Sequence, residues 1–204
     1  MHGAFADASS WHGVAALLLD AGHHVIALAN PLRGVRSDAA DVALAIGAMA
    51  GPVVLVGHSY GGSVISAAAR DARNVAALVF VAAFAPDEGE TAGSLSGRFP
   101  GSTLATALAP PVPLANGGHD LYISQERFAD QFAADVPREQ ARLMAVTQRP
   151  IANSALEEPS GRPAWRHLPS WFVHGTEDKN IPPAALAFMA QRAVAKRAVV
   201  VEGA

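Results

Sequence analysis

The chain alternates short runs of apolar, β-forming residues with segments whose apolar residues recur every three or four positions. Runs of the first kind have the length and composition of buried strands. They cover residues 24–30, 53–56, 75–84, 171–175 and 198–203. Because these runs carry apolar residues on both faces of a strand, the pattern predicts a sheet that is covered on both sides.

Helical spacing marks the segments between these runs. A first helix is predicted after a cap at Ser9 or Ser10, a second opens at Ser37 with Asp38 in its first turn, and a third follows Ser59. Strands that alternate with helices form a mainly parallel sheet with helices on both faces. The sequence therefore predicts an α/β fold.

The pattern of apolar and polar residues changes between residues 87 and 168. No run in this stretch has the pattern of a core strand, and amphipathic helical stretches occur around 124–134 and 137–148. More than eighty residues are too many for a simple connection. We therefore interpret residues 87–168 as an inserted cap, between a first core part at 1–86 and a second at 169–204.

Composition excludes several classes of function. Of the 204 residues, 50% are hydrophobic, which predicts one globular domain rather than a disordered chain. The formal net charge is −3, and no long run of one charge sign is present, so the sequence shows no basic patch that would bind nucleic acid or an anionic membrane surface. The chain has no cysteine, so it has no disulfide and no thiolate nucleophile. We expect a cytoplasmic protein, and a homodimer is an open alternative to a monomer.

The turn after residues 53–56 holds the candidate nucleophile. Gly57-His58-Ser59-Tyr60-Gly61 fits Gly-x-Ser-x-Gly, in which the serine sits at the apex of a strained turn between a strand and a helix. The hydroxyl of Ser59 would project above the carboxyl ends of the strands, where amides of the helix N-terminus face a developing oxyanion. The β-formers before this turn favour a nucleophile over a chance match.

Four stretches together resemble the α/β-hydrolase superfamily, and within it the plant-type esterase and hydroxynitrile lyase group with its bacterial relatives. They are HGAFADASSW at 2–11, VVLVGHSYGG at 53–62, VFVAAFAPDEGE at 79–90 and HGTEDKNIP at 174–182. The resemblance implies that Ala4 N–H and Tyr60 N–H form an oxyanion hole. It also implies hydrolase chemistry. The sequence has no metal cluster, phosphate-binding loop or dinucleotide fingerprint, and we expect no cofactor because this chemistry needs none.

The candidate acid is Asp178, which follows the run 171–175 at the position where the resembling family keeps the carboxylate that orients the catalytic histidine. An aspartate there could instead serve the turn before the helix expected at Pro182-Pro183. Asp87, after the run 75–84, is the alternative acid, because some α/β-hydrolases draw their carboxylate from that place.

No histidine fits the role of general base. In the resembling family it follows the last strand, which here would be two positions beyond Ala204. Among the eight histidines, His2 belongs to the oxyanion loop, His58 should point away from the site, and His174 ends the acid-bearing strand.

Family members also have a strand before His-Gly, where this chain has only Met1. We therefore expect a fragment that lacks a central strand, the base and the final helix.

Three functions remain open. The first is a serine carboxylesterase for small apolar esters, impaired in residues 1–204 because loss of the triad histidine costs on the order of 10⁶ in turnover. The second is a hydroxynitrile-lyase-type carbon–carbon cleavage, although those relatives have threonine at the place of Gly3. The third is a ligand-binding protein without turnover. The apolar residues that could form a pocket or the cap's own core are Leu104, Leu108, Leu114, Tyr122, Phe128, Phe132 and Trp165.

Overall fold

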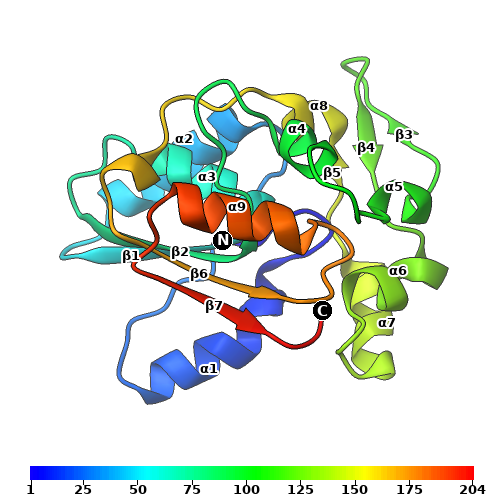
Figure 1. The fold of residues 1–204 in the computed structure, drawn as a ribbon, viewed down its shortest axis with the longest axis horizontal. Helices are drawn as coiled ribbons and strands as arrows, with labels where there is room; N and C mark the ends of the chain where they lie inside the picture. The colour runs from blue at the N-terminus through cyan, green and yellow to red at the C-terminus, as the bar shows by residue number, and fades with distance from the viewer.

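A four-stranded parallel sheet forms the centre of the protein in the computed structural model, which describes residues 1–204 (Figure 1). The strand order is β1-β2-β6-β7. The strands are β1 Val53–Ser59, β2 Val75–Ala83, β6 Ser170–Gly175 and β7 Arg197–Val201. Each coincides with a run predicted from the apolar pattern, so four of the five predicted strands and the α/β class are confirmed.

Helices lie on both faces of this sheet, but unequally (Figure 1). On one face are α2 Val35–Gly47, α3 Tyr60–Ala68 and α9 Pro183–Arg192; on the other are η1 Ala8–Trp11 and α1 His12–Asp20. No residue of α1 is buried, and the side chain of Leu17 is 72% exposed. None of the helices is long and apolar enough to span a bilayer.

The predicted strand at residues 24–30 is wrong. This segment has no strand partner, and most of its residues are exposed. β1 is an edge of the sheet, and only Met1 runs alongside it: the Met1 amine donates to Val56 O at 2.6 Å, and Met1 O accepts from His58 N–H at 3.0 Å. Because no chain lies between 24–30 and β1 to offer a ladder of hydrogen bonds, the apolar run stays extended without pairing.

Two helix starts also differ from the prediction. The side chain of Asp7 accepts the Ser9 N–H at 2.7 Å, so Asp7 rather than Ser9 or Ser10 caps the first helical turn. α2 begins at Val35 rather than Ser37, because Asp38 reaches back to the amides that precede the helix. Both differences arise from side chains that bond to nearby backbone, a competition that apolar periodicity does not show.

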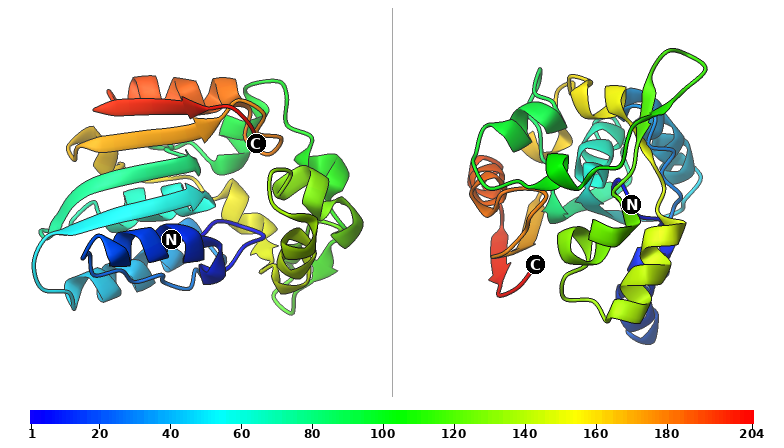
Figure 2. Two further views of the ribbon diagram at one scale, coloured as in Figure 1. Left: turned by 90° about the horizontal axis from the view of Figure 1, so that it is seen from below. Right: turned by 90° about the vertical axis from the view of Figure 1, so that its right-hand side faces the viewer.

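The predicted amphipathic helices in residues 87–168 are present as α6 Gln125–Phe132 and α7 Arg138–Thr147. The part of residues 87–168 that contains α6 and α7 lies beyond the carboxyl ends of the main strands (Figure 2), whereas residues 158–168 run back beside α2 and α3 to the amino end of β6. A small antiparallel sheet with the order β3-β4-β5 was not predicted, since its strands have only two or three residues. The remaining elements are α4 Ala92–Gly97, α5 Leu104–Ala107, β3 Val112–Pro113, β4 His119–Leu121, β5 Ile151–Ala152, α8 Asn153–Glu157 and η2 Ala164–Arg166.

One cluster of 39 buried hydrophobic residues joins the main sheet to residues 87–168. In the sheet, Phe80 of β2 stacks on Phe172 of β6, with ring centroids 4.5 Å apart. Phe128 of α6 and Ile151 of β5 belong to the same cluster and are fully buried. Continuous apolar burial of this kind holds α6 and β5 against the end of the sheet where Ser59 lies.

Candidate functional site

The turn between β1 and α3 has the geometry that the Gly-x-Ser-x-Gly pattern predicts. Ser59 has φ 51° and ψ −125°, a conformation that costs a residue with a Cβ about 1–3 kcal/mol. Its carbonyl oxygen accepts the Phe84 N–H at 3.1 Å, which ties the turn to the end of β2. Ser59 is therefore held at the apex of a strained strand-to-helix turn, at the carboxyl end of β1.

The flanking glycines are required because backbone passes close to each of them. A Cβ at Gly57 would lie 2.7 Å from Gly61 O, and one at Gly62 would lie 2.3 Å from Phe84 O. A Cβ at Gly61 would lie 2.7 Å from Met1 O. The neighbours are main-chain atoms that cannot rotate away, so side chains here would force the turn apart.

The loop that begins at His2 passes directly over the serine. A Cβ at Gly3 would come within 2.6 Å of Ser59 Cβ and 3.2 Å of Ser59 Oγ. The next residue, Ala4, is 4% exposed, and its N–H has no hydrogen-bond partner within the chain. No side chain caps the N-terminus of α3, where the Tyr60 N–H is the first amide. The structure thus brings Gly3 against Ser59, with an unpaired buried amide beside it.

His2 holds this loop in place and is not available as a base. Its Nε2 accepts the Asn30 N–H at 2.9 Å, so Nδ1 carries the proton and donates to Gly3 O at 2.9 Å. The Asn30 side-chain amide donates to His2 O at 2.9 Å. Burial lowers the pKa of His2, which keeps the ring neutral. Sequence reasoning missed Asn30, whose only signal is a polar residue at the end of an apolar run.

Asp178 lies in the turn after β6 and has one oxygen engaged there. Its Oδ1 accepts the N–H groups of Asn180 at 2.8 Å and Ile181 at 2.9 Å. These bonds match the alternative reading of a turn residue before α9. Oδ2 makes no hydrogen bond, and burial raises the pKa of Asp178, although the two amides act to lower it. The catalytic role of Asp178 stays a prediction.

Asp87, the alternative acid, is engaged with another side chain. Both of its carboxylate oxygens accept from Arg166 Nη2 at 2.7 Å, and Oδ1 also accepts from Nε at 3.0 Å. These hydrogen bonds hold the pKa of Asp87 below its usual range. A carboxylate committed to a bidentate arginine pair has little capacity left to orient an imidazole, so the structure favours Asp178 over Asp87.

The other histidines do not supply a base at Ser59. Burial lowers the pKa of His58 to about 4, so its ring is a weak proton acceptor at neutral pH. His174 is on β6, two strands from β1, and its Nδ1 is 3.1 Å from Gly175 O. Two strand spacings are roughly 10 Å, beyond hydrogen-bond reach of Ser59 Oγ. The remaining five are exposed: His12, His23, His24, His119 and His167.

Helix α6 places aromatic rings against the turn between β1 and α3 that carries Ser59, the serine turn. Phe132 makes an edge contact with His58, the neighbour of Ser59, with centroids 6.0 Å apart. It also contacts Phe5 of the loop that begins at His2, with centroids 6.3 Å apart, and Phe128, with centroids 5.1 Å apart. Phe128 is fully buried and belongs to the core of this segment, whereas Phe132 is half-buried. Phe132 is thus the aromatic residue that links residues 87–168 to the serine turn.

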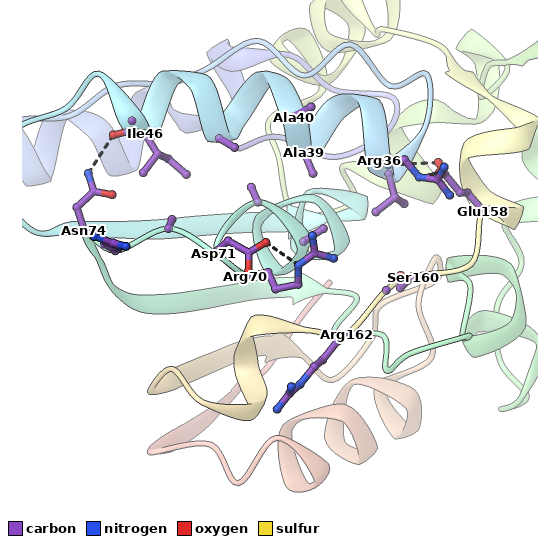
Figure 3. A pocket seen from close by; sticks show the side chains of 18 of the residues that line it. Arg36, Ala39, Ala40, Ile46, Arg70, Asp71, Asn74, Glu158, Ser160 and Arg162 are labelled. Carbon is purple, nitrogen blue, oxygen red and sulfur yellow. Dashed lines mark hydrogen bonds and ion pairs between the residues drawn. The ribbon is translucent and has the colours of Figure 1, made fainter.

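A cavity of about 890 Å³ lies away from this site, between α2 and residues 158–162 (Figure 3). Its floor is formed by small residues such as Ala39 and Ala40, and its rim is charged. Arg70 bonds to Asp71 at 2.9 Å, and Arg36 pairs with Glu158 at 3.8 Å. Neither Ser59 nor Asp178 lines this cavity. Trp165, one of the apolar residues predicted to form a substrate pocket or the cap's own core, lines a different cavity of about 510 Å³ together with Asp87 and Arg166.

Comparisons with known proteins support the fold. The alpha/beta hydrolase family matches residues 1–204. A mutant of polyneuridine aldehyde esterase superposes with a TM-score of 0.83 at 18% identity, covering 100% of this chain and 89% of that chain. A methylesterase from Arabidopsis gives 0.75 at 17% identity, with 98% and 86% covered. A tomato methylketone synthase I variant complexed with beta-ketoheptanoate gives 0.79 at 22% identity, with 100% and 87% covered.

No curated protein sequence matches the chain. At these identities the likeness to solved structures shows the fold alone. The esterases and the methylketone synthase share that fold although their names describe different activities. The predicted fold class and family resemblance are therefore confirmed, and the reaction has to be argued from the site itself.

Proposed function

Because the chain belongs to the alpha/beta hydrolase family, we propose that it is a serine hydrolase, a carboxylesterase that acts on small apolar esters through an acyl-enzyme at Ser59. One observation carries the proposal: Ser59 is held in a strained turn directly beneath Gly3, next to the unpaired buried amide of Ala4. A nucleophile and an oxyanion donor are the two parts that acyl transfer needs within a few ångströms of each other.

The proposed reaction begins with attack of Ser59 Oγ on the ester carbonyl carbon. The serine proton passes to a general base, and the carbonyl oxygen becomes an oxyanion that accepts hydrogen bonds from Ala4 N–H and Tyr60 N–H. The carbon–oxygen bond to the alcohol then breaks, and the alcohol leaves with the proton. Water attacks the acyl-enzyme in the same way and releases the acid. No cofactor takes part in either half of this reaction.

The base is an imidazole in this proposal, and Asp178 orients it through its free Oδ2. The family resemblance assigns the imidazole to a position after β7. Gly203 lies beside the acid loop, because its carbonyl oxygen accepts the Glu177 N–H at 2.8 Å. The chain after β7 therefore passes beside the residue that precedes Asp178, at the carboxyl end of the sheet, where Ser59 also lies.

Residues 87–168 serve as a cap in this proposal. Helices α6 and α7 lie beyond the carboxyl ends of the strands (Figure 2). Phe132 of α6 places an aromatic ring against His58 in the turn that carries Ser59. A half-buried aromatic side chain that contacts His58, the neighbour of the proposed nucleophile, favours an apolar acyl or alcohol group over a charged one. This is the basis for small apolar esters as the substrate class.

The test is a panel of nitrophenyl esters with acyl chains of increasing length, assayed on the native gene product with Ser59→Ala as control. We expect turnover of short apolar esters, loss of turnover in Ser59→Ala, and covalent labelling of Ser59 by a fluorophosphonate probe. Labelling at another residue, or turnover that survives in Ser59→Ala, would overturn the proposal. Saturable ester binding without turnover or labelling would instead support the ligand-binding alternative.

A hydroxynitrile-lyase-type activity is less compatible with the site. Relatives of that type have threonine where this chain has Gly3, and a Cβ at Gly3 would lie 2.6 Å from Ser59 Cβ. A threonine could enter only if the loop or the serine turn moved. Release of cyanide from a cyanohydrin, with loss of the activity in Ser59→Ala, would revive this alternative.

A further inference from the structure

A buried hydrogen bond links the residue after the nucleophile to a carboxylate on another helix. The Tyr60 hydroxyl donates to Asp38 Oδ2 at 2.9 Å, and both residues are fully buried. Tyr60 is the first residue of α3, and Asp38 lies in the first turn of α2. The site described above uses the Tyr60 N–H and gives no role to the Tyr60 side chain or to Asp38.

The Asp38 carboxylate is held from several directions. Besides Tyr60, it accepts the Arg33 N–H at 3.1 and 3.2 Å, the Gly34 N–H at 3.4 Å, and the Ser37 hydroxyl at 3.4 Å. A buried carboxylate with donors on every side has a single low-energy orientation. Its Oδ2 therefore is a fixed hydrogen-bond acceptor for the Tyr60 hydroxyl.

The loop that Asp38 fixes is also attached to the small sheet of residues 87–168. Leu32 O accepts the Ala152 N–H at 3.0 Å, and the Arg33 guanidinium pairs with Asp120 at 2.7 Å. Asp38 is thus connected to the serine turn through Tyr60, to β4 through Arg33, and to β5 through the backbone of Leu32 next to Arg33.

We propose that Asp38 is a positioning residue for the oxyanion hole, because it anchors the Tyr60 ring and thereby sets the direction of the Tyr60 N–H. This proposal rests on the proposed function. The Tyr60 side chain has two torsions between its backbone and its hydroxyl, so a fixed hydroxyl restrains the backbone at the other end. The restraint acts on the peptide that joins Tyr60 to the strained Ser59, where a small rotation would turn the amide away from the oxyanion.

The kinetic test uses Tyr60→Phe and Asp38→Asn in the native gene product. Tyr60→Phe removes the hydrogen bond to Asp38 and keeps the Tyr60 amide, so we expect kcat to fall on the order of tenfold, less than the ~10²–10³ for loss of a whole oxyanion donor. Asp38→Asn keeps one oxygen that can accept the Tyr60 hydroxyl, so its loss of kcat should be smaller. KM should stay within about twofold of wild type, since the anchor does not touch the ester. Ser66→Ala is the matched control, because Ser66 is a buried α3 residue whose hydroxyl has no partner.

The outcomes separate the two proposals. A folded Tyr60→Phe enzyme with wild-type kcat would overturn the positioning role, even if Asp38→Asn failed to fold. A change confined to KM would also overturn it, because it would place the effect on substrate binding. If wild type showed neither ester turnover nor labelling of Ser59, the proposed function would fail, and the anchor would still be testable by the spectroscopic measurement below.

The spectroscopic test uses the small number of tyrosines. The chain has two, Tyr60 and Tyr122, so incorporation of fluorotyrosine gives two ¹⁹F resonances, and the one lost in Tyr60→Phe is assigned to Tyr60. Burial raises the pKa of Asp38 despite its hydrogen bonds. We therefore expect the Tyr60 resonance to titrate with a midpoint above that of an ordinary aspartate.

Asp38→Asn identifies the group that titrates. Besides Asp38, the charged groups that act on the Tyr60 hydroxyl are Arg33 from the preceding loop and Glu158 from the segment after α8. Arginine does not titrate in this range, so the titration should disappear in Asp38→Asn and persist in Glu158→Gln. A flat Tyr60 resonance in wild type, or an unchanged titration in Asp38→Asn, would show that no anchor exists.

Discussion

Gly3 lies against Ser59 so closely that a Cβ atom at position 3 would come within 2.6 Å of Ser59 Cβ and 2.8 Å of His58 O. The loop that carries the candidate oxyanion amide and the turn that carries the candidate nucleophile are therefore in direct contact. Such a contact leaves no room for any residue other than glycine, because backbone on the opposite side cannot rotate away.

Replacement of Gly3 by alanine should destabilise the protein and damage the site. We expect Gly3→Ala to lower the free energy of unfolding by about 1–3 kcal/mol, as overpacking of a filled site does. Gly13→Ala is the control, because nothing lies within 4 Å of a Cβ built at Gly13 in α1. That variant should gain up to about 1 kcal/mol from helix propensity. Denaturant unfolding of both variants measures the difference, and equal effects would contradict the close contact.

The strain at Ser59 predicts that the wild-type residue stabilises the fold less than glycine does. Ser59→Gly should raise the free energy of unfolding by about 1 kcal/mol, since glycine accepts a positive φ without a steric cost. Ser59→Ala keeps the Cβ and should keep the strain. Both variants should lose fluorophosphonate labelling. Thermal unfolding of the three proteins decides the question, and a Ser59→Gly variant no more stable than Ser59→Ala would argue against backbone strain.

Two variants of Asp178 separate its role in the turn from its role in the reaction. Asp178→Asn retains an oxygen for the Asn180 and Ile181 amides, so it should fold with near wild-type stability. Asp178→Ala leaves both amides without that acceptor and should cost about 1–2 kcal/mol. Because orientation of the base needs a carboxylate, both variants should lose ester turnover, by roughly 10⁴ for Asn. Turnover retained in a stable Asp178→Asn variant would leave Asp178 a turn residue only.

The serine turn could be predicted from the sequence because its evidence is local. β-forming residues, two glycines and a serine within a few positions specify a strand, a strained apex and a helix start, and all three are present. The anchor between Asp38 and Tyr60 could not be predicted in this way, since the residues are 22 positions apart. Asp38 is visible in the sequence only as an acidic residue in the first turn of a helix. The apolar run at 24–30 shows that local evidence can also mislead. Its pattern predicts a strand, but a strand forms only where a neighbouring strand pairs with it, and the pattern of one segment does not show whether that neighbour is present.

Asp87 should contribute to acid stability and not to turnover. Hydrogen bonds from Arg166 hold the pKa of Asp87 below its unfolded value, so the pair contributes stability above that unfolded pKa. The contribution is lost as the pH falls through the folded pKa. Asp87→Asn should therefore show a smaller loss of stability between pH 5 and pH 2 than wild type, and unchanged ester turnover. Acid titrations followed by circular dichroism measure the first effect. A loss of turnover in Asp87→Asn would return Asp87 to the role of catalytic acid.

The unequal covering of the sheet predicts unequal protection of backbone amides. No residue of α1 is buried, and residues 24–29 make no ladder hydrogen bonds, whereas α3 is buried along most of its length. Helices gain most of their stability from packing of an apolar face. Amides of residues 12–29 should therefore exchange with deuterium through local opening at free energies far below that of α3. Mass spectrometry of peptic peptides from residues 1–204 resolves the two regions, with α9 as a second buried helix for comparison. Protection of α1 equal to that of α3 would mean that its exposed apolar face, including Leu17, is covered in solution.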